Sequence, residues 1–261
     1  MSNAPKGLAV RTQKRYGWRA DSPDMRDYLL AVEPVKTLPR SVSLRSQMPP
    51  VYDQGQLGSC TANSIGSILE FNELKQAETD GGTPSRLFIY YNERAMEGTV
   101  SQDSGAEIRD GIKSVAQLGA PPETDWPYVI TKFARKPPAR AYKDALKHQA
   151  IRYARVPHTE MGIQTVLAGG YPISFGFTVY ESFESDVGPD GIVPMPEPSE
   201  QVVGGHAVVA IGYKQIRRQL YFECRNSWGP DWGDDGYFWL PASYIASSSL
   251  ASDFWVIEQV E

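Results

Sequence analysis

The spacing of apolar residues changes near residue 150, and this change constrains the fold more than any other feature of the sequence. Before it, four stretches have helical spacing or composition. After it, five stretches alternate apolar and small or polar residues, as β-strands do. The expected helices are residues 60–78, 85–96, 105–119 and 140–149, and the expected strands are 171–180, 206–214, 219–226, 235–241 and 253–260. Such segregation predicts an α+β fold of two packed lobes, with any site between them drawing residues from both.

The first 37 residues are rich in charge, proline and glycine and show little periodicity. We interpret residues 1–37 as an extended arm and residues 38–261 as the folded domain. Within the arm, four large apolar side chains could attach it to a surface: Trp18, Met25, Tyr28 and Leu29. Three prolines after the arm exclude helix there: Pro39, Pro49 and Pro50.

The composition is that of an ordinary globular protein, with 41% hydrophobic and 22% charged residues among 261. A net charge of −5 provides no basic surface for nucleic acid or for a membrane. The N-terminus lacks the apolar core of a secretory signal, and no apolar run is long enough to span a bilayer. We therefore expect a cytoplasmic protein, or one exported without a cleaved N-terminal signal.

Neither a metal nor another cofactor is expected. The possible soft ligands are scattered without paired spacing; they are Cys60, Cys224, His148, His158 and His206. The acidic residues Asp231, Asp234 and Asp235 lack the spacing of a calcium loop, so we interpret them as a solvated turn.

Cys60 lies in the stretch QGQLGSCTAN, where a helix is expected to begin. Backbone N–H groups and the helix dipole stabilise a thiolate at such a position. A lone cysteine is more often a small buried apolar residue. The neighbouring glycines, Gly55 and Gly58, favour the first interpretation because they allow a ligand to approach the backbone closely.

His206 and Asn226 are the other candidates for chemistry. His206 follows two glycines at the start of an apolar strand, where it is either a core histidine or a general base. Asn226 is followed by Ser227 and Trp228, so its amide could orient an imidazole that the indole shields from water. The alternative is a turn asparagine beside a core tryptophan. The remaining histidines, in a charged stretch and a loop, are expected at the surface.

Together, the stretches QGQLGSC, GGHAVVAIGY and RNSWGPDWGDDGY resemble the papain-like cysteine peptidases, and more closely a bacterial subgroup of them. The resemblance covers Leu38 to the C-terminus. The interval from Cys60 to His206 fits the separation of about 130–150 residues in papain and cathepsins. The resemblance implies a helical left lobe and an antiparallel β right lobe, with the active-site cleft between them.

Carried over to matching positions, the resemblance makes Cys60 the nucleophile and His206 its proton partner. Asn226 would hold the imidazole, Trp228 would cover that contact, and Gln54 would stabilise the oxyanion beside the Cys60 N–H. Small residues would line the cleft where a peptide substrate lies: Ser104, Gly105, Gly204 and Gly205. An imidazolium and a helix N-terminus would lower the pKa of the thiol to roughly 3–4, as in papain.

The sequence departs from the family pattern in three places. Leu57 replaces a cysteine, which removes the usual disulfide and suits a reducing compartment, and Thr61 replaces an aromatic residue. We expect Cys224 to point into the core, although a Cys60–Cys224 disulfide stays open. The arm lacks the long helical pattern of papain-like pro-segments. We hypothesise that it crosses the body and covers part of the cleft; the alternative is a purely structural arm.

Three functions fit these residues. The first is a cysteine endopeptidase that hydrolyses peptide bonds through an acyl-enzyme. The second is an acyltransferase or amidase with the same thioester chemistry, and the third is a catalytically silent homologue that binds peptides. All four catalytic positions carry the required residue type, which argues against the third.

Overall fold

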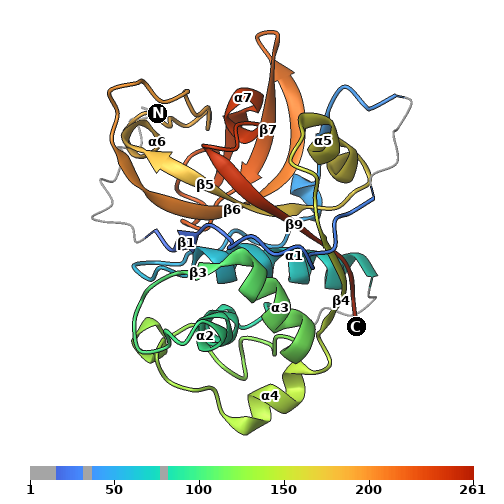
Figure 1. Ribbon diagram of the computed structural model, residues 1–261, viewed down its shortest axis with the longest axis vertical. Helices are drawn as coiled ribbons and strands as arrows, with labels where there is room; N and C mark the ends of the chain where they lie inside the picture. Colours follow the sequence, from blue (N-terminus) through green and yellow to red (C-terminus); the bar gives the residue numbers. More distant parts are fainter. Residues whose placement is uncertain (1–15, 32–36, 77–81) are drawn as a thin grey trace, which may run out of the picture.

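The computed structural model describes residues 16–31, 37–76 and 82–261. Figure 1 shows two lobes, with helices α2, α3 and α4 on one side, a sheet on the other, and α1 lying between them. The helical lobe contains α2 (Arg86–Met96), α3 (Ile108–Leu118) and α4 (Ala139–Ala145), and the helix between the lobes is α1 (Cys60–Gln76). The α+β two-lobe fold predicted from the sequence is confirmed.

The second lobe is built on a seven-stranded sheet with the order β4-β9-β5-β6-β7-β8, in which β2 also pairs with β6. Its strands are β2 (Val42–Ser43), β4 (Ala150–Arg155), β5 (Ile173–Tyr180), β6 (Val202–Ile216), β7 (Gln219–Arg225), β8 (Tyr237–Pro241) and β9 (Ala251–Val260). The strand pairs of this sheet are antiparallel. Three short helices accompany it: α5 (Glu160–Ala168), α6 (Glu181–Ser185) and α7 (Ala242–Ile245). Two short 3-10 helices lie at Arg45–Gln47 and Ile130–Lys132.

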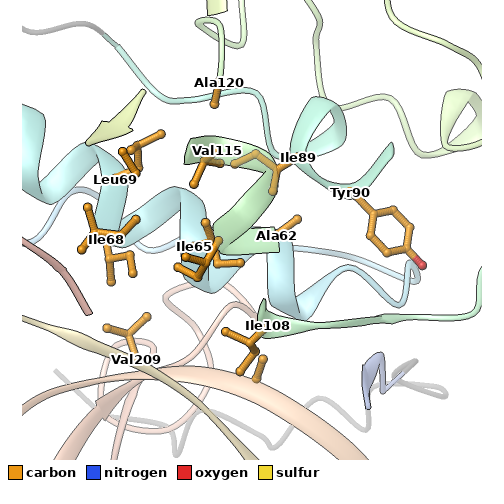
Figure 2. Packing of buried hydrophobic residues seen from close by; sticks show 14 of the residues in the cluster. Ala62, Ile65, Ile68, Leu69, Ile89, Tyr90, Ile108, Val115, Ala120 and Val209 are labelled. Carbon is orange, nitrogen blue, oxygen red and sulfur yellow. The ribbon is translucent and has the colours of Figure 1, made fainter. Parts of the chain in front are cut away.

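Helix α1 joins the two lobes. Its residues from Cys60 to Glu73 are all buried. The buried polar side chains among them are hydrogen-bonded, as those of Asn63, Ser64 and Asn72 are to backbone carbonyls of the same helix or the residue before it. Figure 2 shows Ile65 and Ile68 of α1 lying between Val115 of α3 and Val209 of β6. The nucleophile candidate thus begins the most enclosed helix of the described chain.

Strand β6 contributes to two apolar cores because successive side chains point to opposite faces of a sheet. Ala207 and Val209 pack in the core shared with α1. Val208 and Ala210 pack in the core on the other face. This alternation fixes the side on which His206 emerges, since it immediately precedes Ala207.

The described part of the arm, residues 16–31, lies along the boundary between the lobes (Figure 1). Its strand β1 (Trp18–Arg19) pairs in parallel with β3 (Ala106–Glu107) of the helical lobe. Residues 1–15 and 32–36 of the predicted arm lie outside the described residues. Among the described residues, no helix is long and apolar enough to cross a membrane.

Two details of the predicted secondary structure are wrong. The helix expected over 105–119 begins only at Ile108, because Ala106 and Glu107 pair with the arm. The helix expected over 140–149 ends at Ala145, and β4 follows it. The five predicted strands are all present, although β6 begins at Val202, before the predicted start.

The predicted attachment of the arm is also partly wrong. Trp18 packs against the body, but Met25, Tyr28 and Leu29 are 101%, 75% and 67% exposed. Backbone hydrogen bonds hold this part instead: Arg155 N donates to Tyr28 O at 2.7 Å, and Leu30 N donates to Arg155 O at 2.8 Å. With the main chain held by β4, these side chains point away from the body.

Candidate active site

Cys60 is the first residue of α1 and is fully buried where the lobes meet. The backbone N–H groups of Ala207, Gly17 and Thr61 lie near its sulfur and favour the thiolate. The Ala207 contact brings the sulfur to the residue next to His206 on β6. Residues 146 positions apart are therefore brought together by the packing of α1 on this strand.

The imidazole of His206 is held by Asn226 and Trp228. His206 Nε2 lies 2.8 Å from Asn226 Oδ1, and the same oxygen accepts the Ser227 N–H at 2.8 Å. Because this oxygen acts as an acceptor, Nε2 carries the hydrogen of that bond. The Trp228 ring stacks on the imidazole at a centroid distance of 4.8 Å. Histidine and asparagine are both buried, so their hydrogen bond is shielded from water.

Gln54 is fixed between the loops that carry Cys60 and Asn226. Its Nε2 donates to Leu57 O at 2.8 Å, and its Oε1 accepts the Ser227 hydroxyl at 2.7 Å. Tyr128 Oη donates to Gln54 O at 3.0 Å. The sequence analysis does not predict that Ser227 or Tyr128 positions Gln54. The place of Ser227 beside Asn226 could have indicated such a role, whereas Tyr128 lies 74 residues from Gln54 and nothing in the sequence links the two.

The arm fills the space beside Cys60. Gly17 lies on the sulfur, and its carbonyl accepts the Ala106 N–H at 2.8 Å. On one side of Gly17, the Tyr16 ring lies 5.8 Å from the His206 ring and 6.0 Å from the Trp228 ring. On the other side, Trp18 enters the body and donates its indole N–H to Asp253 at 3.2 Å.

Glycines make this close contact possible. A Cβ on Gly17 would lie 1.8 Å from Gly58 O, and one on Gly105 would lie 2.0 Å from Gly17 O. On the opposite wall, a Cβ on Gly204 would lie 2.7 Å from the Tyr16 side chain, and one on Gly205 would lie 2.5 Å from Trp18 O. Gly105 and Gly205 thus contact the backbone of the arm, and Gly204 contacts a side chain of it.

Ser104 takes a different place from its predicted neighbour Gly105. Its hydroxyl donates to Thr99 Oγ1 at 3.0 Å and to Gly105 O at 3.1 Å. These bonds shape the turn before β3, so the serine supports the wall rather than contacting the arm through its hydroxyl.

The thiol of Cys60 does not have the lowered pKa that the sequence predicts. Burial raises its pKa to about 11, although the three backbone N–H groups act in the opposite direction. The prediction is wrong for this state because the sulfur is fully buried, with Gly17 of the arm beside it. The thiol is protonated at neutral pH while the arm is in place.

Cys224 is buried and both cysteines are free, so the disulfide left open by the sequence is not formed. Cys224 packs among the apolar side chains of the outer core, as predicted. Burial raises its pKa well above the ordinary value. It is therefore an inert thiol.

The other two histidines are more constrained than predicted. His148 Nδ1 lies 2.9 Å from Glu73, which raises the pKa of the imidazole. His158 contacts Ile245 O at 2.7 Å and lies against Phe254. Both are half-buried, and these contacts give them structural roles.

The acidic turn is only partly solvated. Asp235 is exposed, but Asp234 forms an ion pair with Arg45 at 2.7 Å. The part of the chain that the structure describes contains no group of three or more metal-ligating side chains.

The comparisons with known proteins agree with this geometry. The family model described as papain family cysteine protease matches residues 38–255. The chain belongs to this family. It is 44% identical over 247 residues to an uncharacterised peptidase C1-like protein of Acanthamoeba polyphaga mimivirus, covering 91% of this chain and 76% of that protein.

Two further matches show the range of the family. Xylellain, a cysteine protease from Xylella fastidiosa, has 40% identity and a TM-score of 0.88, covering 97% of this chain and all of the xylellain chain. Cysteine proteinase 3 of Entamoeba histolytica is 28% identical, and the match spans 79% of this chain but only 64% of that protein. The chain is thus a papain-like cysteine peptidase, and the transferase and silent-binder alternatives are not favoured.

Proposed function

We propose that Cys60, His206, Asn226 and Gln54 carry out peptide hydrolysis, and that the arm holds the peptidase in a latent state. The position of residues 16–18 beside Cys60, in close contact with glycines of both walls, is the observation that carries this proposal. A substrate and the arm compete for the same space. Activity therefore requires the arm to leave or to be removed.

The geometry supports the following chemistry once the arm has left. Asn226 holds the Nε2 hydrogen of His206, so Nδ1 is the nitrogen that exchanges a proton with the thiol. The thiolate attacks the carbonyl carbon of the substrate, and the Cys60 N–H and the Gln54 amide stabilise the resulting oxyanion. The imidazolium then protonates the leaving amine, and water hydrolyses the acyl-enzyme.

The docked arm is a poor substrate for the site that it covers. It presents the Gly17 N–H to the sulfur, while the Gly17 carbonyl points to Ala106. A thiolate attacks a carbonyl carbon, and the Gly17 carbonyl is held by the Ala106 N–H. We therefore expect the Gly17–Trp18 bond to stay intact while the arm is docked.

Gly17→Ala tests the proposal in the full-length protein. The added Cβ meets backbone atoms of Gly58 that cannot rotate away, so we expect the arm to be displaced. Cleavage of a fluorogenic peptide should increase at least tenfold. Gly188→Ala is the matched control, because a Cβ there meets its nearest atom at 3.6 Å and should leave the rate unchanged.

Two further outcomes decide the proposal. Adding Cys60→Ala to Gly17→Ala should abolish cleavage; remaining activity would show that another group is the nucleophile. Equal activity of Gly17→Ala and the parent, with both folded, would contradict latency.

A further inference from the structure

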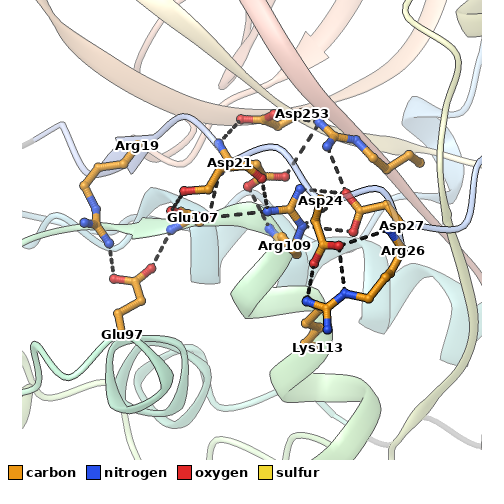
Figure 3. Close-up of polar contacts among 12 residues, drawn as sticks. Arg19, Asp21, Asp24, Arg26, Asp27, Glu97, Glu107, Arg109, Lys113 and Asp253 are labelled. Atoms are coloured by element: carbon orange, nitrogen blue, oxygen red, sulfur yellow. Dashed lines mark hydrogen bonds and ion pairs between the residues drawn. The ribbon is translucent and has the colours of Figure 1, made fainter.

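A cluster of charged side chains joins the arm to both lobes beyond Trp18 (Figure 3). It consists of Asp21 and Asp27 of the arm, Arg109 of α3, Arg155 of β4 and Asp253 of β9, and we call these five residues the arm latch. Its members come from three elements of the body that are distant in sequence. The site chemistry described above uses none of them.

Asp21 lies at the centre of the arm latch, and its side chain is 0% exposed. One carboxylate oxygen accepts the Arg109 backbone N–H at 3.0 Å. The other accepts the indole N–H of Trp255 at 2.8 Å. The Asp21 backbone N–H donates to Asp253 Oδ2 at 2.8 Å, which places the two aspartates side by side.

The guanidinium groups of the arm latch are directed mainly at the other two carboxylates. Arg109 Nη2 lies 2.6 Å from Asp27. Arg155 lies 3.0 Å from Asp27 and 2.8 Å from Asp253, but 3.8 Å from Asp21. Three carboxylates thus share two guanidinium groups, and Asp21 has the longest ion-pair distance.

The charged groups around the arm latch do not neutralise its excess negative charge. Glu107 of β3 accepts two hydrogen bonds from Ser22 and lies 3.7 Å from Arg109. Lys113 of α3 and Arg26 of the arm are both paired with Asp24. Asp110 of α3, Arg19 and Glu97 lie near Glu107 and add one positive and two negative charges.

We propose that the arm latch binds a proton on Asp21, so that the arm docks most tightly in mildly acidic solution and loosens as the pH rises through neutrality. Protonation removes the unmatched negative charge. It leaves Asp27 and Asp253 paired with the two guanidinium groups. The protonated carboxyl keeps acceptor capacity for the Arg109 and Trp255 N–H groups.

The direction of this pH dependence follows from the linkage between protonation of Asp21 and docking of the arm. Burial and the nearby Asp253 raise the pKa of Asp21 to about 7, whereas a released arm returns it to the ordinary value near 4. Between these values the docked arm holds a proton that the released arm loses. Docking therefore strengthens by up to about tenfold for each pH unit that the pH falls below about 7. Above that pH, Asp21 no longer contributes to the dependence.

The docking equilibrium can be measured without enzymatic activity. The Ala106 and Asp21 amides donate to Gly17 O and Asp253, respectively, so both are protected from hydrogen exchange only while the arm is docked. The experiment uses full-length Cys60→Ser protein, which removes the titration of the thiol. Exchange rates are measured from pH 5.5 to 8 and corrected for the intrinsic pH dependence of exchange.

We expect protection of these two amides to rise roughly thirtyfold from pH 8 to pH 5.5. Asp21→Asn removes the titrating carboxyl and should abolish most of this rise. Asp24→Asn removes a carboxylate of the same arm outside the latch and should retain it. Any contribution of His206 is common to all three chains and cancels in the comparison. Equal pH dependence with Asp21 and with Asn at this position overturns the proposal.

One further measurement covers an arm that fails to dock in the Asp21→Asn variant. The carboxyl carbon of Asp21 is then titrated by NMR in the parent: an inflection above pH 6 supports the proposal, and one near pH 4 overturns it. The effect on activity rests on the proposed latency, but this test does not. If docking shows the expected pH dependence but displacing the arm leaves the cleavage rate unchanged, the result contradicts the proposed latency and not the protonation of Asp21.

Discussion

The arm contacts the rest of the molecule in two chemically different ways. Residues 16–18 fit between glycines and aromatic rings at the catalytic residues, whereas residues 21–27 are held largely by carboxylates and guanidinium groups. The first region depends on shape and tolerates no added carbon at Gly17. The second depends on charge, so pH and salt adjust it. In the proposed latent state, blocking the site and retaining the arm are thus assigned to separate parts of one segment.

The largest expected effect concerns the Cys60 thiol in the shape-dependent region. With the arm docked, burial raises the pKa of this thiol to about 11. Displacing the arm by Gly17→Ala removes much of that burial and leaves the helix N-terminus and His206 to favour the thiolate. We expect the pKa to fall below 8.5, the ordinary cysteine value. Rates of iodoacetamide alkylation as a function of pH measure it, with Cys60→Ser reporting the background from Cys224. An unchanged inflection would show that the arm does not control the thiol.

The next largest effect is expected for Trp18→Ala. The indole packs against Gly176 and Gly205 and donates to Asp253, so its removal leaves a cavity and loses a hydrogen bond. Docking should weaken by about 3 kcal/mol, or roughly a hundredfold. Exchange of the Ala106 amide measures this change. Met25→Ala is the control, because Met25 is fully exposed; an equal loss in both variants would contradict the importance of the packed indole.

The smallest effect is expected from salt. Raising NaCl from about 0.05 to 0.5 M should weaken docking only about threefold, since partly buried pairs are screened incompletely. Asp27→Asn removes ion pairs of the arm latch and should reduce this dependence. Trp18→Ala should retain the dependence of the parent. If Trp18→Ala instead lost its salt dependence in amide exchange, the division of the arm into two regions would be wrong.

The sequence predicted the two-lobe fold and the residues brought together at the site, because that information is local. Cys60 follows a Gly-Ser pair, His206 follows two glycines, and Asn226 precedes Ser-Trp-Gly. Each stretch sits at the end of an element whose periodicity is readable. Packing those elements then brings the side chains together.

The features of the site that the sequence does not predict depend on contacts between residues far apart in the chain. Nothing in the sequence pairs Gly17 with Gly58, or Tyr128 with Gln54, because these pairs lie 41 and 74 residues apart. The pKa of Cys60 was predicted in the wrong direction for the same reason. It is set by water exclusion, which depends on where the arm lies rather than on the neighbours of the cysteine in the chain.

The burial of α1 has a consequence for how the molecule opens. Local unfolding spreads least easily into the elements with the most buried contacts, and Cys60 begins a helix that is buried through Glu73. The described arm, in contrast, has exposed side chains along much of its length. We therefore expect the arm to detach as a separate unit of low stability while α1 and β6 stay folded. Cys60 and His206 then keep their relative positions when a substrate arrives, because both belong to the part of the protein that we expect to unfold most slowly.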